Sequence, residues 1–222
     1  MQLEVLGTNA AFAKEGTTNS FILWKYENDG ILLDCGFSVY QELLKKNYAD
    51  KINTVLISHL HQDHSGSLVN LLDYRFKILN RTTSVGGTPT DKFLQLHSGT
   101  GWEAKIHTFP ENVSYTKFEV PHAKGMECYA LFVEDKLLYR GDSASSVLSR
   151  PEAQAAKMII HDVSLGKGGI IISVDELADA APEIKAKTFL SHYLPKDYDL
   201  LAAKAQALGF AGVLKAGDKF EL

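Results

Sequence analysis

Short apolar runs, each of strand length and rich in β-branched or aromatic residues, recur along the chain and constrain its fold more than any other feature. Most of these runs end at Gly, Asp, Asn or His, as strands that lead into turns do. Two pairs of runs are typical of β-hairpins, Phe21 to Leu33 across ENDG and Cys128 to Tyr139 across EDK. Fully apolar runs such as MII and TFL need cover on both faces, so the pattern favours sheets with helices packed outside.

Helical patterns separate these hairpins. We expect helices over residues 38–47, 67–74, 90–97 and 199–208, and SVDE at Ser173 to Glu176 matches a capping box. GKGG at 166–169 is interpreted as a solvated loop in preference to a phosphate cradle. The chain has 222 residues, 45% of them hydrophobic, and shows no repeat, linker or charge block. These features predict one globular domain over residues 1–222.

Charge and composition exclude several classes of function. A formal net charge of -4 argues against stable binding of nucleic acid by bulk electrostatics, although a nucleotide or a short RNA could still be a substrate. Cys35 and Cys128 are too few for a disulfide framework and are expected to be buried small residues. No signal peptide is visible and no apolar segment approaches the roughly 20 residues that cross a bilayer. We expect a cytoplasmic protein that does not contact a membrane.

One segment, TVLISHLHQDHSG, places three histidines and an aspartate directly after an apolar run. Alternation along an extended segment points His59 and His61 the same way, and a tight turn would bring Asp63 and His64 round beside them. One short loop can therefore offer two metals two ligands each. Imidazole nitrogen and carboxylate oxygen at this spacing suit Zn²⁺, and also Fe or Mn. The alternative, a polar turn with chance histidines, is disfavoured by the density of the cluster.

Further candidate ligands follow other apolar runs, where sheet proteins commonly carry their functional loops. Each of these residues alone has an ordinary explanation as a turn former or an edge histidine, but together with the cluster they indicate one site. They are Asp34, His122, Asp142, His161, Asp162 and His192. His97 and His107 do not follow this rule and are interpreted as surface residues.

The order of the segments LLDCG, SHLHQDHSG, VPHAKGMECYALFVEDKLLYRGDS and TFLSHY resembles the metallo-β-lactamase superfamily over nearly the whole chain. This resemblance implies an α/β (α+β) fold, a four-layer αββα sandwich of two mixed β-sheets flanked by helices. It also implies two divalent metal ions, most simply Zn²⁺ with Mn²⁺ or Fe as alternatives. By analogy, the first metal takes His59, His61 and His122, the second takes Asp63, His64 and His192, and Asp142 bridges them. Asp34 would fix a ligand histidine through its other ring nitrogen.

Within the superfamily, LGTNAAF, TTNSFIL and GDS are similar to the ribonuclease Z and cyclic-nucleotide phosphodiesterase branch. HDVS at 161–164 stands where that branch has HEAT, so that Asp162 matches the glutamate that orients a further histidine. In this chain Ile172 stands in place of that histidine. A Gly/Pro-rich arm of the kind that holds tRNA is also missing from the sequence. Both departures disfavour tRNA processing, and His161 becomes the candidate general acid, with a purely structural role for it equally open.

The resemblance implies a metal-dependent hydrolase that cleaves a small phosphodiester, such as a cyclic nucleotide, through a metal-bridging hydroxide. Asp63 and His161 are the residues we expect to act in catalysis. A lactonase or thioester hydrolase remains an alternative because the same hydroxide attacks carbonyl carbon. A non-catalytic ligand-binding protein is a third, disfavoured by the complete ligand set. We expect a small-molecule substrate and, by analogy with the branch, a homodimer.

Overall fold

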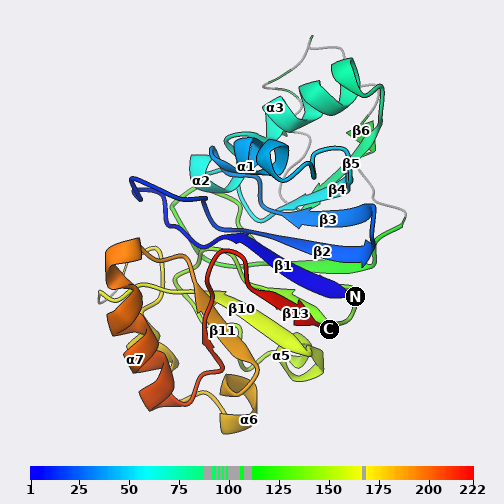
Figure 1. Ribbon diagram of the computed structural model, residues 1–222. Helices are drawn as coiled ribbons and strands as arrows, with labels where there is room; N and C mark the ends of the chain where they lie inside the picture. The colour runs from blue at the N-terminus through cyan, green and yellow to red at the C-terminus, as the bar shows by residue number, and fades with distance from the viewer. Residues whose placement is uncertain are drawn as a thin grey trace.

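Two β-sheets pack face to face in the computed structural model, and helices cover their outer faces (Figure 1). This confirms the predicted αββα layers. The structure describes residues 1–87, 92, 93, 95, 97, 99, 106, 107, 112–166 and 169–222. Among these residues, no helix has both the length and the apolar character needed to cross a membrane.

The first sheet has the strand order β13-β1-β2-β3-β4-β5-β6. Strands β13, β1, β2 and β3 pair antiparallel, whereas β3, β4, β5 and β6 run parallel. The parallel strands therefore end at one edge of the sheet. The bounds are β1 (Gln2–Gly7), β2 (Ser20–Tyr26), β3 (Asp29–Leu33), β4 (Ile52–Ile57), β5 (Thr83–Gly87), β6 (Ile106–His107) and β13 (Lys219–Glu221).

The second sheet has the order β12-β11-β10-β9-β8-β7. Its hairpins β7–β8 and β8–β9 are antiparallel, and β9 to β12 run parallel. The bounds are β7 (Tyr115–Glu119), β8 (Tyr129–Val133), β9 (Leu137–Tyr139), β10 (Met158–Asp162), β11 (Thr188–Ser191) and β12 (Gly212–Val213).

Short helices flank each sheet. Those beside the first are α1 (Val39–Lys45), α2 (Gln62–Ser65), α3 (Leu68–Asp73) and the π-turn η1 (Tyr74–Ile78). Those beside the second are α5 (Pro151–Ala155), η3 (Val174–Leu177), α6 (Pro182–Lys185), η4 (Pro195–Asp197) and α7 (Tyr198–Leu208). The capping box at Ser173 is confirmed, but it closes only the single 3₁₀ turn η3. Of the predicted helix 90–97 the structure describes only residues 92, 93, 95 and 97, and the centre of the 166–169 loop lies outside the described residues.

Strand β10 shows why a fully apolar run predicts a strand whose two faces are both buried. Met158 and Ile160 belong to the core between the two sheets, and Ile159 belongs to the core beneath the outer helices of the second sheet. All three side chains are almost fully buried. Cys35 and Cys128 are likewise buried, as expected, and burial raises the pKa of the Cys35 thiol to about 12.

The C-terminal run GVLKAGDKFEL is not one strand. A turn that includes Gly217, at φ 95°, divides it into β12 in the second sheet and β13 in the first. Pairing of Gln2 with Glu221 places the two termini side by side (Figure 1).

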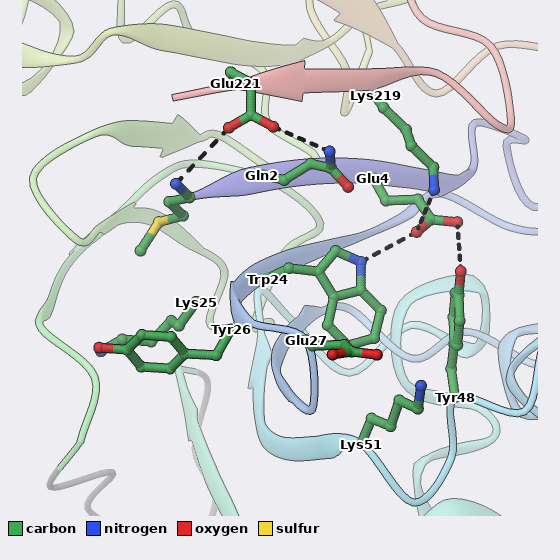
Figure 2. A pocket seen from close by; sticks show the side chains of 11 residues that line it. Gln2, Glu4, Trp24, Lys25, Tyr26, Glu27, Tyr48, Lys51, Lys219 and Glu221 are labelled. Atoms are coloured by element: carbon green, nitrogen blue, oxygen red, sulfur yellow. Dashed lines mark hydrogen bonds and ion pairs between the residues drawn. The ribbon is translucent and has the colours of Figure 1, made fainter.

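A pocket of about 420 Å³ lies over β13, β1 and β2, at the end of the first sheet where the termini meet (Figure 2). Its most buried charged group is Glu4, which is 1% exposed. Trp24 Nε1 donates to its carboxylate at 3.1 Å, and Lys46 and Lys219 each lie 3.5 Å from it. Donors from three parts of the chain therefore satisfy this carboxylate, and the pocket is distinct from the cluster described below.

Candidate metal centre

The candidate ligands lie where strands of both sheets end. His59 and His61 follow β4, and α2 carries Asp63 and His64. The second sheet contributes the rest, since residues His122, Asp142 and His192 come shortly after β7, β9 and β11. The structure thus brings together all seven ligands that the resemblance implied. They form two groups, in each of which the candidate ligand atoms lie within 4.8 Å of one another.

Three imidazoles converge in the first group. His61 Nδ1 lies 3.0 Å from His59 Nε2 and 3.1 Å from His122 Nε2. His122 Nδ1 donates to the carbonyl of Ile170 at 2.8 Å, so its neutral ring presents a lone pair at Nε2. A single proton on His61 cannot satisfy both neighbouring nitrogens. Around a tetrahedral Zn²⁺, nitrogen ligands lie about 3.3 Å apart, so the separations fit a shared cation.

The second group contains polar atoms without partners. His64 Nε2, His192 Nδ1 and Asp142 Oδ1 are buried and make no hydrogen bond. His64 Nε2 lies 3.3 Å from Asp63 Oδ2, and His192 Nδ1 lies 3.3 Å from Asp142 Oδ1. Orphaned buried nitrogen and oxygen atoms are costly, and a bound cation would satisfy them together.

Asp142 belongs to both groups. Its Oδ1 faces His64 Nε2 at 3.6 Å and His192 Nδ1, while its Oδ2 lies 3.7 Å from His122 Nε2. A carboxylate with one oxygen toward each ligand group has the geometry of a bridge between two cations.

Asp34 organises the first sheet's side of the cluster. Its carboxylate accepts from Ser58 N at 2.7 Å and lies 2.7 Å from His64 Nδ1. It also accepts from the hydroxyl of Tyr139 at 2.6 Å. The bond to Nδ1 leaves His64 Nε2 free to face the cluster, which is the role that the resemblance implied for Asp34.

Electrostatics favour the metal-binding forms of His59 and Asp63. Burial and the neighbouring imidazoles lower the pKa of His59 well below its usual range, so its ring is neutral. Burial alone would raise the pKa of Asp63, but the hydrogen bond with His192 Nε2 and the nearby imidazole of His64 lower it well below its usual range. Neutral imidazole and ionised carboxylate are the forms that coordinate divalent cations. Burial would lower the pKa of His64 and His192, but Asp142 and the other neighbouring carboxylates raise it above its usual value.

His161 does not reach this cluster. It lies on β10 beside Asp162 and is fully buried, with Nδ1 3.1 Å from the backbone oxygen of Asp162. Alternation along β10 points Asp162 toward Asn19 and Tyr139, and turns His161 to the other face, on which Ile159 and Val163 lie. Burial lowers the pKa of His161 well below its usual range. This position does not favour a general acid and fits the structural alternative.

The Asp162 prediction is only partly matched by the geometry. Asn19 donates to both of its carboxylate oxygens at 3.0 Å and accepts from Ser191 Oγ at 2.6 Å, next to His192. Asn19 thus connects Asp162 to Ser191, the residue that precedes the candidate ligand His192, and burial raises the pKa of Asp162 to about 6. Ile172, which replaces the branch's histidine, is 7% exposed and packs in the outer core.

Sequence reasoning missed Asn19, Tyr139 and the carbonyl of Ile170. Asn19 lies in TTNS, quoted only for its likeness to the branch, and Tyr139 resembled an ordinary core residue. Of the two histidines interpreted as surface residues, His97 is half-buried against Phe93, with ring centroids 4.8 Å apart. Neither His97 nor His107 belongs to the ligand groups found among the described residues.

A pocket of about 580 Å³ opens beside the cluster. Its polar end contains candidate ligands from both groups, and most of its remaining wall is apolar. The lining consists of Ala10, Ala11, Phe12, His61, Gln62, Asp63, Asp142, Val163, Ser164, Leu165, Ile170, Ile171, His192, Tyr193, Leu194, Asp197 and Leu201. This volume suits a small molecule better than a polymer.

The fold is that of metallo-β-lactamase fold proteins, and its site carries two groups of His and Asp that could hold divalent metal ions. The fold is shared with the metallo-β-lactamase fold protein YhfI from Bacillus subtilis, with a TM-score of 0.77, 20% identity and coverage of 100% and 99% of the two chains. Human tRNase Z, short form, also has it, with a TM-score of 0.70, 17% identity and coverage of 100% and 99%.

Residues 1–86 and 86–220 match the family of the anti-Pycsar protein Apyc1, and the chain belongs to this family. The anti-Pycsar protein Apyc1 of Bacillus phage 010DV004 is 27% identical, in a match that covers 87% of this chain and 89% of the phage protein.

Proposed function

We propose that the protein is a dinuclear metallophosphodiesterase that opens the phosphodiester of a small cyclic nucleotide. The observation that carries this proposal is the pair of ligand groups joined by Asp142 at the polar end of a small-molecule pocket. Membership of the Apyc1 family and a fold shared with a tRNase Z, an enzyme named for cleaving RNA, support a phosphoester substrate.

The donor set fits two divalent cations. His59, His61 and His122 would hold the first, Asp63, His64 and His192 the second, and Asp142 both. Zn²⁺ is the cation that this mixture of imidazole and carboxylate suits best, with Mn²⁺ or Fe as alternatives. Bound there, such cations lower the pKa of water and neutralise charge that develops on a phosphate.

The side chains around the cluster have separable tasks. The hydrogen bonds of His64 and His122 to Asp34 and Ile170 fix which ring nitrogen faces the cluster. Asp63 lines the pocket beside the ligand groups, and from there its carboxylate would accept the proton of an attacking water. The apolar wall excludes bulk water from the other end of the substrate.

A lactone or thioester hydrolase is the second candidate. The predominance of apolar residues in the pocket favours it, because an acyl chain would bury well against Val163, Leu165 and Leu194. The chemistry of attack at carbonyl carbon needs no other ligand set.

An activity panel separates these candidates. Protein reconstituted separately with Zn²⁺, Mn²⁺ and Fe²⁺ would be assayed on 3′,5′-cyclic nucleotides, pre-tRNA, lactones and glutathione thioesters, with metal content measured by elemental analysis. We expect about two equivalents of metal and the highest kcat/KM for cyclic nucleotides. Preferential turnover of lactones or thioesters would select the second candidate, and a stable protein that binds no metal would contradict both.

Two expectations belong with this proposal. A single domain over residues 1–222 and a homodimer both stay predictions, the second supported by the resemblance to the branch. Light scattering coupled to size-exclusion chromatography measures the mass directly, and a mass near 24.5 kDa would contradict the dimer.

A further inference from the structure

The pocket beside the metal centre has two chemically different ends. His61, Asp63, Asp142 and His192 form one end, where a charged phosphate would lie. The other end has few polar groups. A substrate that fills both ends therefore needs one charged group and one flat or apolar group, which is the division between the phosphate and the base of a nucleotide.

Phe12 is the most exposed of the large apolar side chains among the described residues, at 90%, although it lines this pocket. The loop that carries it is held in place. Asn9 N donates to Thr17 O at 3.2 Å, and Ala13 N closes a turn onto Ala10 O at 3.1 Å. Phe12 therefore stands on an ordered turn, which favours a ligand contact over a mobile loop tip.

The same loop is attached to the metal centre. Ala10 N donates to Tyr193 O at 3.1 Å, and Tyr193 N donates to Thr8 O at 3.1 Å. Tyr193 directly follows the candidate ligand His192. These backbone bonds fix the position of Phe12 relative to the cluster.

Ile170 lines the pocket from a different loop. Its side chain is 48% exposed, and its carbonyl accepts the hydrogen bond from His122 Nδ1 at 2.8 Å. Ile172 N, two residues on, donates to Ser143 O at 2.8 Å, next to Asp142. This apolar side chain is thus also fixed relative to the candidate ligands.

We propose that Phe12 is the platform on which the base of the substrate stacks, and that Ile170 adds an apolar contact to the same base. The inference rests on the proposed function, since it names where the nucleotide's base lies. Every base has a π face, so stacking raises affinity for bases in general, and the larger faces of purines gain more than those of pyrimidines.

The test compares Phe12→Ala, Phe12→Trp and Ile170→Ala in metal-loaded protein. Matched controls are Tyr26→Ala and Ile78→Ala, because Tyr26 and Ile78 are 75% and 69% exposed and do not line this pocket. The substrates are cyclic AMP, cyclic CMP and a base-free methyl riboside 3′,5′-cyclic phosphate. A non-hydrolysable cyclic AMP phosphorothioate, titrated by calorimetry, gives Kd without turnover, and elemental analysis verifies metal content.

We expect Phe12→Ala to raise KM and Kd for base-bearing ligands by about 5- to 150-fold, with a larger effect on cyclic AMP than on cyclic CMP. Values of kcat, and all constants for the base-free substrate, should change little. Phe12→Trp should retain affinity, and Ile170→Ala should show a smaller loss in the same direction.

Two results would overturn the inference: unchanged Kd in Phe12→Ala, or an equal loss for the base-free substrate, which would mean that the loop only shapes the metal centre. An equal loss of affinity in Tyr26→Ala would show that the effect does not depend on this pocket, and would also overturn the inference. If the unmodified, metal-loaded protein hydrolyses no cyclic nucleotide, the proposed function fails, and the phosphorothioate titration still decides whether Phe12 binds a base.

Discussion

At the scale of single residues, Asp142 is the carboxylate that the two groups of candidate ligands share. Its two oxygens face different ligand groups, so its removal should weaken both. We expect Asp142→Ala to lower kcat/KM for a bis-aryl phosphate by more than about 100-fold, the upper range found for groups that only orient a ligand. Asp175→Ala, which removes an exposed carboxylate paired with Lys204, is the control. Steady-state kinetics on protein of measured metal content test this prediction. An unchanged rate in Asp142→Ala would contradict the role of Asp142 as a ligand shared by two cations.

A substitution at Asp34 tests whether the orientation of the His64 ring affects metal binding. Asp34→Asn keeps the size of the side chain and tolerates the backbone φ of 59°, but it removes the charged partner of His64 Nδ1. We expect metal affinity to fall about 10- to 100-fold. Competition with a chromophoric chelator measures this affinity, and Asp29→Asn serves as the control outside the site. Equal affinities in all three proteins would show that His64 needs no such partner.

The candidate ligands could be predicted from the sequence, whereas Asn19 and Tyr139 could not, and the reason is the distance along the chain between each residue and its partners. Ligand histidines cluster or follow apolar runs, so spacing alone exposed them, and the resemblance assigned their roles. Asn19 and Tyr139 act through partners more than 100 residues away, which no local pattern encodes. His161 follows the same rule without facing the site, because the rule locates only the end of a strand, whereas the register of β10 decides which side chain points toward the site.

At the scale of elements, hairpins were the most predictable feature. Phe21 pairs with Leu33 across the predicted turn, and Leu131 pairs with Tyr139 in the second hairpin. Their pairing depends on neighbouring residues and turn chemistry. The return of the last residues to the first sheet was not predictable, because β13 pairs with the other end of the chain.

The contacts of Glu4 with Trp24 and Lys219, here called the Glu4 cluster, should stabilise this non-local pairing. The carboxylate of Glu4, in β1, accepts a hydrogen bond from Trp24 of β2 and lies 3.5 Å from Lys219 of β13 (Figure 2). We expect Glu4→Ala to lower the free energy of unfolding by about 1–3 kcal/mol, since a buried charged acceptor is lost and its donors are left unpaired. Urea unfolding of the metal-loaded protein measures the change.

Gln2→Ala is the matched control, because Gln2 on the same strand makes only an exposed hydrogen bond with Glu221. Its effect should stay below about 0.5 kcal/mol. Both variants should keep the kcat of the unchanged protein, since the cluster lies at the opposite end of β1 from the metal centre. Equal stability of the two variants would contradict the role of Glu4.

At the scale of the whole molecule, the candidate metal centre takes its residues from the parts of the chain that build both sheets. His59, His61, Asp63 and His64 come from the part of the chain that builds the first sheet, and His122, Asp142 and His192 from the part that builds the second. The two segments that match the family, residues 1–86 and 86–220, divide the chain at nearly the same place. The αββα layers were predictable from apolar periodicity and the resemblance, but the face-to-face contact that completes the site is a property of the folded chain.

Metal removal should therefore weaken the molecule as a whole. Cations that bind only the folded protein stabilise it by mass action, about 2.7 kcal/mol at a free concentration 100 times Kd. For a chain of this length, each kcal/mol lost from the free energy of unfolding lowers Tm by about 2–4 °C. We expect a chelator to lower Tm by about 5–10 °C and excess Zn²⁺ to restore it. Because Asp142→Ala loses the ligand shared by both groups, its Tm should respond less to the chelator. Identical melting curves with and without chelator, in protein shown to have lost its metal, would mean that the cations do not hold the two sheets together.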